Sequence, residues 1–263
     1  MSYDLALIGG GNMGAALLGG LLSGGVVTTD QVVVVELYPD RRAELAGLFP
    51  GVTITDGVAE CASAVLAVKP PDIVAVAAEA AAAGATRVLS IAAGVTIAAI
   101  EFVVGGGVAV LRAMPNTPAL VGAGVSALAG GRHAAEADLE WAEQILAGVG
   151  LVERLGEHQL DAVTGLTGSG PAYVFLAAEA LIDAGVIAGI PRETVERMVA
   201  QLLVGSSKLL AERGDPAALR AMVTSPGGTT AAGLRVLEER ATRAAFIDAV
   251  VAATARSHEL GAG

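Results

Sequence analysis

The chain has 263 residues, with 16 Lys and Arg against 27 Asp and Glu, which gives a net charge of -11 at pH 7. This length allows one large domain or two modest ones, each with a buried core. The negative charge argues against a surface that follows nucleic-acid phosphates, because such a surface needs clustered positive charge. Aromatic residues make up 3% of the chain and hydrophobic residues 54%, so the core must be built from Ala, Val, Leu and Gly.

Neither of the two most apolar stretches has the features of a targeting or membrane segment. The first 27 residues lack the positive n-region of a signal peptide, since no Lys or Arg precedes Arg41. The run from Ala172 to Ile190 carries Glu179 and Asp183 near its centre. Each of these charges would cost about 3 kcal/mol in a membrane span. The sequence therefore predicts a soluble cytoplasmic protein without a membrane segment.

Short apolar runs alternate with helix patterns in the first half of the chain. Residues 3–8 form a strand pattern that ends at three glycines, and residues 15–22 follow as a helix of small residues. A four-valine strand at 32–35 and a Pro-Asp turn complete a βαβ unit. Further strand patterns occur at residues 52–55, 64–68, 88–92 and 108–114, with weaker ones at 124–129 and 151–155 that would extend the sheet edge. Continuous apolar runs are typical of parallel strands buried on both faces, so we predict an α/β fold with an N-terminal Rossmann-type doubly wound sheet.

The pattern changes after Gly156, where helical periodicity takes over. Pro191 opens a predicted helix at 192–210, and Gly233 precedes another at 234–260. We therefore predict a dinucleotide-binding Rossmann domain at residues 1–156 and an all-helical substrate and dimerisation domain at 157–263. The Ala- and Gly-rich composition of the second domain lets helices approach closely and suits an intertwined dimer.

A glycine fingerprint follows the first predicted strand and opens a helix, as a dinucleotide-binding turn requires. Gly9 allows the tight turn, Gly11 lets a pyrophosphate approach backbone N–H groups, and Gly14 lets the helix sit close to the sheet. An ordinary Gly-rich turn would explain the same glycines, but the strand before and the acidic residue after favour dinucleotide binding. The predicted cofactor contacts here are Gly9, Gly11, Asn12, Met13 and Gly14.

The acidic residue is Glu36, which ends the second strand 22 positions beyond Gly14. A carboxylate there accepts hydrogen bonds from both ribose hydroxyls and repels a 2'-phosphate, which favours NADH. Arg41 and Arg42 lie one turn further on. They would neutralise a 2'-phosphate if the loop folds back, or form a solvated helix start if it does not, so NADPH stays open.

Five motifs occur in the order and spacing of pyrroline-5-carboxylate reductases, and the chain resembles that family over essentially its whole length. They are Ala67-Val68-Lys69-Pro70, Ser90-Ile91-Ala92-Ala93-Gly94-Val95, Arg112-Ala113-Met114-Pro115-Asn116-Thr117-Pro118, Gly168-Ser169-Gly170-Pro171-Ala172-Tyr173 and Ser225-Pro226-Gly227-Gly228-Thr229-Thr230. The last two are the most specific. The resemblance implies NAD(P)H-dependent reduction of 1-pyrroline-5-carboxylate to L-proline, the last step of proline biosynthesis. It also implies a homodimer interlocked through the helical domain, or a decamer assembled from such dimers.

The same resemblance assigns further cofactor contacts to the carboxyl ends of central strands, where ligands of open α/β sheets bind. They are Ala67, Val68, Lys69, Pro70, Ala92, Ala93, Gly94 and Asn116. Pro71 stands where the family more often has a polar residue. Asn116 would present its amide to the nicotinamide, or would simply cap its turn.

The segment from Ser225 to Thr230 is the stronger chemical candidate. Pro226 stops one helix, and Gly227 and Gly228 permit positive φ. Thr229 and Thr230 begin the next helix, whose free N–H groups would bind a carboxylate without any basic side chain. The resemblance assigns the substrate carboxylate to this loop and the ring nitrogen to Thr230, the catalytic residue. A capping loop with two N-cap hydroxyls explains one threonine but not the pair of glycines. The predicted substrate contacts are Ser225, Gly227, Gly228, Thr229 and Thr230.

Glu157 matches an acidic position near the substrate in related enzymes, or is a solvated first-turn carboxylate. We assign residues 168–173 mainly to helix packing, with Tyr173 as a candidate wall of the active site.

The absence of an obvious proton donor bears on the reaction. His133, His158 and His258 lie outside all the motifs, and no metal-binding set is expected. Ketone reduction needs a proton donor, whereas an imine can arrive already protonated. A 3-hydroxy-acid dehydrogenase would use a Lys early in the second domain, and none lies between residues 158 and 207. A cofactor-sensing module without turnover would not need the Ser225–Thr230 loop.

Overall fold

The computed structural model describes residues 2–261 and divides into two compact units. The first comprises Met1–Ser169 with Val251–Gly263, and the second comprises Gly170–Val250. These units follow contacts and group residues 157–169 with the sheet, whereas the predicted division at residue 156 follows the change in sequence pattern. That division stays a prediction.

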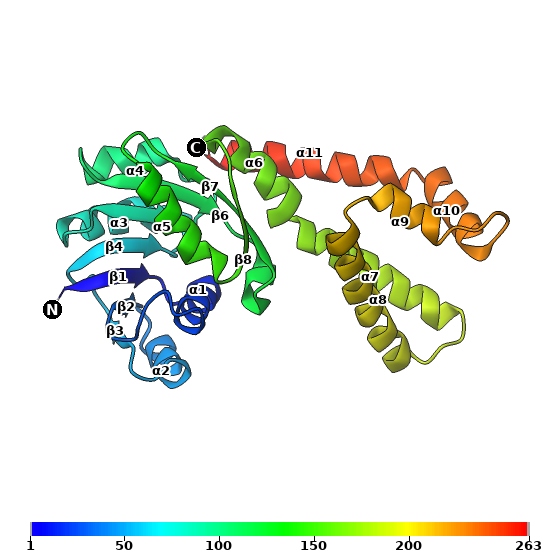
Figure 1. Ribbon diagram of the computed structural model, residues 1–263, viewed down its shortest axis with the longest axis horizontal. Helices are drawn as coiled ribbons and strands as arrows, with labels where there is room; N and C mark the ends of the chain where they lie inside the picture. Colours follow the sequence, from blue (N-terminus) through cyan, green and yellow to red (C-terminus); the bar gives the residue numbers. More distant parts are fainter. Residues whose placement is uncertain (1, 262–263) are drawn as a thin grey trace. The chain divides into compact units, whose positions relative to one another are not determined.

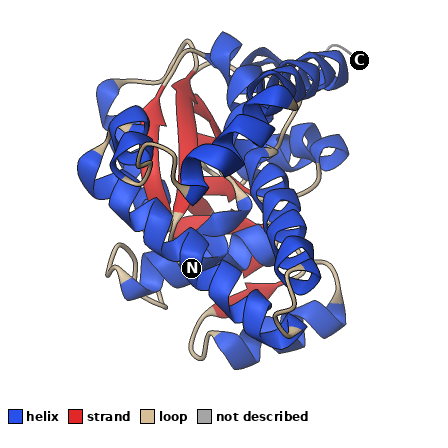
Figure 2. Cartoon of the chain, turned by 90° about the vertical axis from the view of Figure 1, so that its right-hand side faces the viewer, coloured by secondary structure: helices blue, strands red, loops and turns tan. Residues whose placement is uncertain are grey.

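The first unit is built on an eight-stranded sheet in the order β3-β2-β1-β4-β5-β6-β7-β8, drawn in red in Figure 2. The strands are β1 (Tyr3–Ile8), β2 (Val32–Val35), β3 (Thr53–Thr55), β4 (Cys61–Leu66), β5 (Arg87–Ser90), β6 (Ala109–Met114), β7 (Gly124–Gly130) and β8 (Gly150–Arg154). Within the described sheet, β6 and β7 pair antiparallel and the other neighbours pair parallel. The predicted doubly wound sheet is confirmed, and the two weaker strand patterns do extend its edge.

Two strand predictions ran too far at their carboxyl ends. β4 stops at Leu66 and β5 at Ser90, although apolar residues continue to Val68 and Ala92. Ala92 is only 6% exposed and Ala67, Val68 and Ile91 are half-buried, so these residues are apolar because the turns after the strands are partly buried. Hydrophobicity reports burial in such turns and not the strand itself.

Helices cover both faces of the sheet (Figure 1). Alternate strand residues fill two cores, one on each face of the sheet. Leu5 and Leu7 lie in the core formed with α1 (Asn12–Ser23), α2 (Pro39–Leu48) and α5 (Glu136–Ala147). Ala6 and Ile8 lie in the core formed with α3 (Ile73–Ala82) and α4 (Ile97–Val104). Each fully buried Leu or Ile contributes about 1.5–3 kcal/mol relative to an exposed one. The two cores hold the strand ends, and hence the turns that follow them, in fixed positions.

The rest of the chain is helical. It comprises α6 (Leu160–Val163), a π-helical turn (Thr164–Gly168), α7 (Gly170–Ile187), α8 (Arg192–Arg213), α9 (Pro216–Met222), α10 (Thr229–Glu239) and α11 (Thr242–Gly261). The single helix predicted at 234–260 is wrong, because the chain breaks at Ala241, whose φ is 54°. Gly233 lies inside α10 and precedes no helix. A left-handed alanine ends the helix without the Gly or Pro signal that sequence reasoning relies on.

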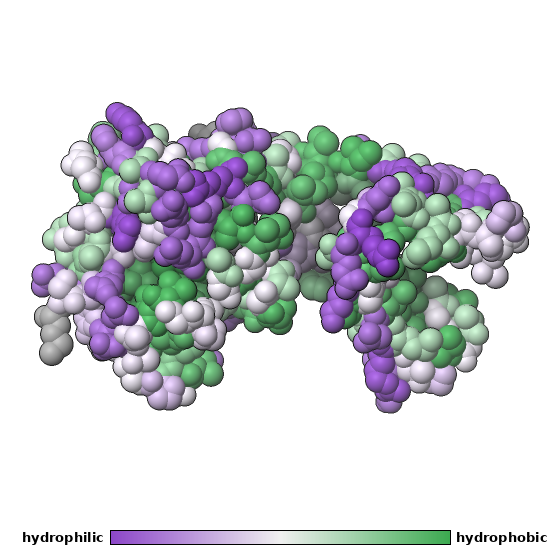
Figure 3. Space-filling view, viewed as in Figure 1, coloured by the Kyte–Doolittle hydropathy of each residue, from purple (hydrophilic) through white to green (hydrophobic). Residues whose placement is uncertain are grey.

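The second unit buries few of its apolar side chains. Among its described residues, Val195 and Val199 are the buried hydrophobic ones. Phe175, Leu176 and Ile187 of α7 are 62%, 66% and 87% exposed. In Figure 3 the surface over α7 is largely hydrophobic, beside the hydrophilic strip along α8. Monomeric proteins rarely leave so large an apolar surface open to water.

One helical stretch, Glu157–Ile187, is long and apolar enough to cross a membrane by length and composition alone. It contains the π-helical turn and, on α7, Glu179 and Asp183. Asp183 accepts a hydrogen bond from Arg192 Nη2 at 2.7 Å. These charges count against insertion in a bilayer.

Candidate active site

The predicted cofactor residues gather at one edge of the sheet. Each follows the carboxyl end of a strand in the parallel part, where consecutive strands point the same way. Gly9 follows β1, Glu36 follows β2, Ala67 follows β4, Ala92 follows β5 and Asn116 follows β6. Ligands of open α/β sheets bind outside this edge.

The glycine turn has the geometry that an approaching phosphate requires. Gly9 has a φ of 108°, and a Cβ on it would lie 2.5 Å from the carbonyl oxygen of Ala67. A Cβ on Gly14 would collide with the carbonyl oxygen of Gly9. A Cβ on Gly11 would meet no described atom within 4 Å, so the space beside this N-cap of α1 is open. Asn12 and Met13 begin the helix there, and the first N–H groups of a helix have no partner within it.

Glu36 is held against the glycine turn. Glu36 is buried, with only 8% of the residue exposed. Oε2 accepts a hydrogen bond from the Gly10 N–H and Oε1 accepts one from the Tyr38 N–H, both at 3.0 Å. Each carboxylate oxygen has a second lone pair with which it can accept from a ribose hydroxyl. The sequence did not predict the hydrogen bond between Glu36 and Gly10, because residue spacing alone does not show which N–H groups a carboxylate accepts from.

Arg41 and Arg42 turn back onto the same loop. Arg41 Nε donates to the carbonyl oxygen of Gly10 at 2.7 Å, and its Nη1 lies 2.7 Å from Glu44 Oε2. Arg42 Nη1 donates to the carbonyl oxygens of Glu36 and Leu37 at 2.9 and 2.8 Å. Both arginines lie in the first turn of α2, and their side chains turn back, Arg41 onto the glycine turn and Arg42 onto the loop that carries Glu36.

The turn after β4 leaves the sheet through a 3-10 turn, Pro70–Asp72. The Ala67 N–H donates to the carbonyl oxygen of Ile8 at 2.7 Å, which keeps the start of this turn beside β1. Lys69 is the extended residue before the 3-10 turn, with φ -67° and ψ 151°, and its side chain is exposed. Pro71 fits inside the turn, where its fixed φ is compatible with the backbone.

The amide of Asn116 is engaged inside the protein. Nδ2 donates to the carbonyl oxygen of Thr167 at 3.0 Å, and Oδ1 accepts from the Val125 N–H at 2.9 Å. The residue is 8% exposed. These bonds tie the turn after β6 to β7 and to the π-helical turn. The side chain makes no cap hydrogen bond to the 3-10 helix Thr117–Val121, so the expectation that it simply caps its turn is wrong.

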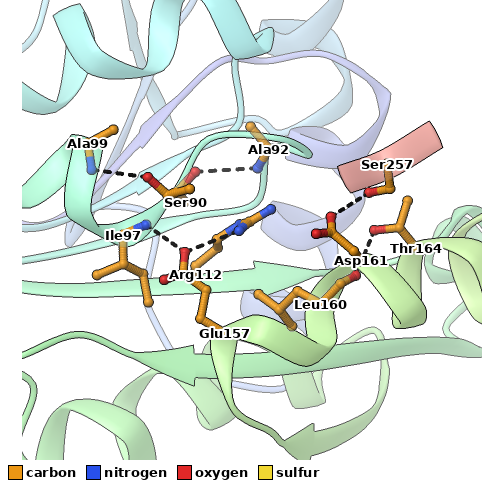
Figure 4. A network of polar contacts seen from close by, with 11 residues as sticks. Ser90, Ala92, Ile97, Ala99, Arg112, Glu157, Leu160, Asp161, Thr164 and Ser257 are labelled. Carbon is orange, nitrogen blue, oxygen red and sulfur yellow. Dashed lines mark hydrogen bonds and ion pairs between the residues drawn. The ribbon is translucent and has the colours of Figure 1, made fainter. Parts of the chain in front are cut away.

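Glu157 forms part of a partly buried network of polar contacts (Figure 4). Its Oε1 accepts a hydrogen bond from the Ile97 N–H at 2.6 Å and pairs with Arg112 Nη1 at 3.1 Å. Arg112 is 6% exposed, and a buried guanidinium without a partner would be costly. Glu157 does lie in the first turn of a 3-10 helix, with its side chain 31% exposed, but its carboxylate is paired within the protein. Arg112 stands out in the sequence as a charged residue within the apolar strand pattern at 108–114, but the sequence does not show that its partner is Glu157.

The Ser225–Thr230 loop lies in the second unit and leads into α10. Gly227 has a φ of 68°, whereas Gly228 has a φ of -77°, so only the first glycine uses the left-handed region as expected. Gly228 needs no side chain for another reason, since a Cβ there would collide with Ser225 Oγ. Its N–H donates to the carbonyl oxygen of Ser225 at 3.0 Å.

The start of α10 has no side-chain cap. Gly228 is the N-cap residue and makes no side-chain hydrogen bond, so neither threonine hydroxyl serves as the N-cap. Thr229 is exposed and Thr230 is half-buried. The capping interpretation is therefore wrong for these hydroxyls, and the first N–H groups of an 11-residue helix are available to an anion.

Tyr173 joins helices within the second unit. Its hydroxyl donates to the carbonyl oxygen of Ala249 at 3.4 Å, which links α7 to α11. In the first unit, a Cβ on Gly168 would lie 3.2 Å from Met114 Cε. Both contacts agree with the expectation that residues 168–173 serve helix packing.

Comparisons with known proteins cover the whole chain. A family model described as pyrroline-5-carboxylate reductase dimerisation matches residues 157–260, and one described as NADP oxidoreductase coenzyme F420-dependent matches residues 4–94. The pyrroline-5-carboxylate reductase of Mycobacterium leprae is 44% identical, over 97% of this chain and 96% of that protein.

Two solved structures are similar over nearly their full lengths. A pyrroline-5-carboxylate reductase from Coxiella burnetii superposes with a TM-score of 0.91 at 36% identity, covering 98% of both chains. The pyrroline carboxylate reductase of Plasmodium falciparum, solved with NADP bound, superposes with a TM-score of 0.85 at 29% identity, again covering 98% of both chains.

Proposed function

The chain belongs to the pyrroline-5-carboxylate reductase family, and from that premise we propose how its residues bind and reduce the substrate. The protein is an oxidoreductase that converts 1-pyrroline-5-carboxylate to L-proline with NAD(P)H, the last step of proline biosynthesis. The observation that carries this function is the match at 44% identity over 97% of the chain. The geometry at the sheet edge and at the start of α10 supports a role for each group of residues.

The cofactor lies along the carboxyl edge of the sheet in this proposal. Its pyrophosphate binds at the open start of α1, where the backbone of Gly11 is uncrowded. Glu36 accepts from the ribose hydroxyls. The nicotinamide half contacts the turns after β4 and β5, namely residues 67–70 and 92–94. Asn116 contributes by holding the turn after β6.

Both nicotinamide cofactors serve, with NADH preferred. Two backbone N–H groups hold the Glu36 carboxylate in place, so it cannot swing away from a 2'-phosphate without losing both hydrogen bonds. Its negative charge would repel that phosphate. Arg41 and Arg42 lie on the same loop and offset part of the repulsion, which keeps NADPH usable.

The substrate carboxylate binds at the uncapped start of α10. Gly227 and Gly228 keep side chains away from this helix end, and Ser225 supplies a carbonyl that holds the Gly228 N–H. The N–H groups of Thr229 and Thr230 then face the carboxylate at the positive end of the helix dipole. No basic side chain is needed there.

The Thr230 hydroxyl fixes the ring nitrogen. The substrate enters as the protonated imine, and the hydroxyl oxygen accepts the hydrogen bond of its N–H. The bound cofactor supplies the hydride that reduces the ring C=N carbon. Because the nitrogen already carries its proton, the protein needs no strong acid at the reacting centre. Orientation of the ring is then the main contribution of the chain.

The protein forms oligomers through its helical region, and we infer that the basic assembly is a cytoplasmic homodimer, from which a decamer can be built. The exposed apolar side chains of α7, α8, α10 and α11 support burial against a second copy. Glu179 and Asp183 count against lipid as the covering. Sedimentation should give a mass of twice 26.0 kDa or a multiple of that dimer; a monomer at micromolar concentration would contradict the proposal.

The decisive assay follows oxidation of NADH and of NADPH with racemic 1-pyrroline-5-carboxylate. We expect turnover with both cofactors. A 3-oxo acid serves as the competing substrate, because a 3-hydroxy-acid dehydrogenase was the nearest alternative. Robust oxidation with the 3-oxo acid and none with the cyclic imine would falsify the proposed function.

A further inference from the structure

The last turn of α11 lies against the turn that follows β5, although about 160 residues separate them in the chain. A Cβ on Gly94 would lie 3.5 Å from the carbonyl oxygen of Leu260. In the other direction, a Cβ on Gly261 would lie 3.3 Å from the carbonyl oxygen of Gly94. Two backbones thus meet at glycines on both sides. All these residues belong to the first unit.

A hydrogen bond between two side chains fixes this end of α11. Ser257 Oγ donates to Asp161 Oδ1 at 2.7 Å (Figure 4). Ser257 is 6% exposed and is the buried residue of α11 in the described part of the helix. Asp161 lies on α6, four positions beyond Glu157. The helix end is therefore anchored by a polar contact and not by an apolar face.

Residues 157–161 also contact the other end of this turn, where α4 begins. Glu157 accepts from the Ile97 N–H, where α4 begins, and pairs with Arg112 beneath it. Residues 157–161 consequently contact α4 through one carboxylate and α11 through the other. The turn at residues 91–96 lies between these two supports (Figure 4).

The start of the turn is bonded to the strands, since the Ile91 N–H donates to the carbonyl oxygen of Leu66 at 3.2 Å and the Ala92 N–H donates to Ser90 Oγ at 3.4 Å. The supports from α11 and residues 157–161 therefore matter most for the part around Gly94. Gly94 has a φ of 77° and no side chain to pack. A cavity of about 160 Å³ remains beside it, lined by Gly94, Thr96, Arg112, Asp161, His258 and Gly261. The contacts of Gly94 with the last turn of α11 support this part of the turn, and the hydrogen bond between Ser257 and Asp161 holds that helix end in place.

We propose that Ser257 is a positioning residue for the cofactor: through Asp161 and the backbone of Leu260 and Gly261, it holds the turn at residues 92–94 in the form that receives the nicotinamide. This inference rests on the proposed function, because the assignment of that turn to the cofactor belongs there. The residues that touch the cofactor lie on the turn itself. Ser257 does not itself touch the cofactor and acts on these residues through the end of α11.

The first test compares Ser257→Ala with Ser257→Thr and with the control Ser23→Ala. Ser23 also donates a hydrogen bond near a helix end, but its partner is the backbone carbonyl of Gly20, and Ser23 is exposed at the end of α1. Ser257→Ala should raise the dissociation constant for NADH about fivefold, the size of one hydrogen bond, as measured by fluorescence titration. Ser257→Thr should restore binding, because it keeps the hydroxyl, and Ser23→Ala should leave it unchanged.

Hydrogen exchange of the cofactor-free protein provides a readout that does not depend on activity. Peptides covering residues 91–97 should exchange faster in Ser257→Ala than in the wild type, while peptides of β1 should not change. Gly261→Ala should have the same effect on NADH binding, because its methyl group would press on the Gly94 carbonyl. This variant keeps the test valid if Ser257→Ala folds poorly.

A double-mutant cycle between Ser257→Ala and Asp161→Ala completes the test, since the two changes should not add if they remove the same bond. The inference is overturned if NADH binding and exchange at 91–97 stay at wild-type values in Ser257→Ala and Gly261→Ala. It is also overturned if the KM values for NADH and for the imine rise equally. Failure of the proposed function is a separate result, namely a wild-type protein that binds NADH but does not reduce the imine.

Discussion

The sheet unit and the helical unit are similarly rich in apolar residues, yet they differ in how many of those residues they bury. The largest fully buried side chains, among them Leu7, Leu17 and Leu111, all lie in the sheet unit. In the described part of the helical unit, the buried hydrophobic residues are Val195 and Val199. The sheet unit buries its large apolar side chains within a single chain, whereas the helical unit leaves many of its large apolar side chains exposed.

This difference in burial distinguishes the proposed cofactor site from the proposed substrate site. The cofactor edge is supported by two cores and by polar bonds such as that between Glu36 and Gly10. The substrate loop begins α10, in the unit with little core of its own. Cofactor binding should therefore be a property of the single chain, whereas substrate binding should depend on association with a second copy.

The largest expected effect concerns Thr230. Thr230→Ala should lower turnover by a factor of about a hundred to a thousand, since loss of one oriented hydrogen bond at a reacting centre costs about 2.7–4 kcal/mol. NADH binding, which belongs to the sheet unit, should not change. Steady-state kinetics and fluorescence titration measure the two quantities.

Thr229→Ala is the matched control for Thr230. Its expected contribution is the backbone N–H, which alanine keeps, so its turnover should stay near the wild-type value. An equal loss in both variants, or near-normal turnover in Thr230→Ala, would return the loop to a structural role.

The next effect concerns association. Phe175 and Phe102 are both exposed, at 62% and 89%, but Phe175 lies on α7 in the helical unit and Phe102 lies on α4 in the sheet unit. Phe175→Asp should weaken the dimer by about 3 kcal/mol, roughly a hundredfold in its dissociation constant, because an unpaired charge would be buried in the interface. Phe102→Asp should leave sedimentation unchanged. The same behaviour in both variants would remove the distinction between the two apolar surfaces.

Cofactor choice should respond to the charge of Glu36 and not to the net charge of the protein. Glu36→Ser should shift the ratio of kcat/KM values toward NADPH by about tenfold, or 1.4 kcal/mol, because it removes the charge that repels a 2'-phosphate. Glu79→Gln on α3 is the control for net charge, since its side chain is exposed on a helix that carries none of the proposed contacts. A wild-type preference for NADPH of tenfold or more would mean that Arg41 and Arg42 dominate.

The smallest effect concerns the break between α10 and α11. The hydrogen bond from Arg243 lowers the pKa of Glu238 below its ordinary value. A lowered pKa in the folded state means that the pair stabilises above about pH 4.3 and that this contribution is lost as the pH falls. Glu238→Gln should therefore lower the midpoint of thermal unfolding slightly at pH 7 and by less near pH 3. An equal decrease at both pH values would contradict the role of the ion pair.

Sequence reasoning worked best where burial and local structure coincide. The strands at residues 3–8 and 32–35 were located at their observed bounds, because strands buried on both faces are apolar throughout. It failed at Ala241, where a left-handed residue ends α10 without a local signal. The bonds of Glu157 to Ile97 and of Asn116 to Thr167 join positions 60 and 51 residues apart, so no periodicity could have revealed them.

The most direct test of the central claim uses the dissociated protein. The Phe175→Asp variant, at a concentration where sedimentation shows monomers, is assayed for NADH binding and for reduction of 1-pyrroline-5-carboxylate. We expect NADH to bind with its wild-type dissociation constant while imine reduction is lost, and we expect reduction to return as the concentration is raised and dimers re-form. Wild-type kcat in the monomer, or loss of NADH binding together with activity, would contradict the separation of the two units.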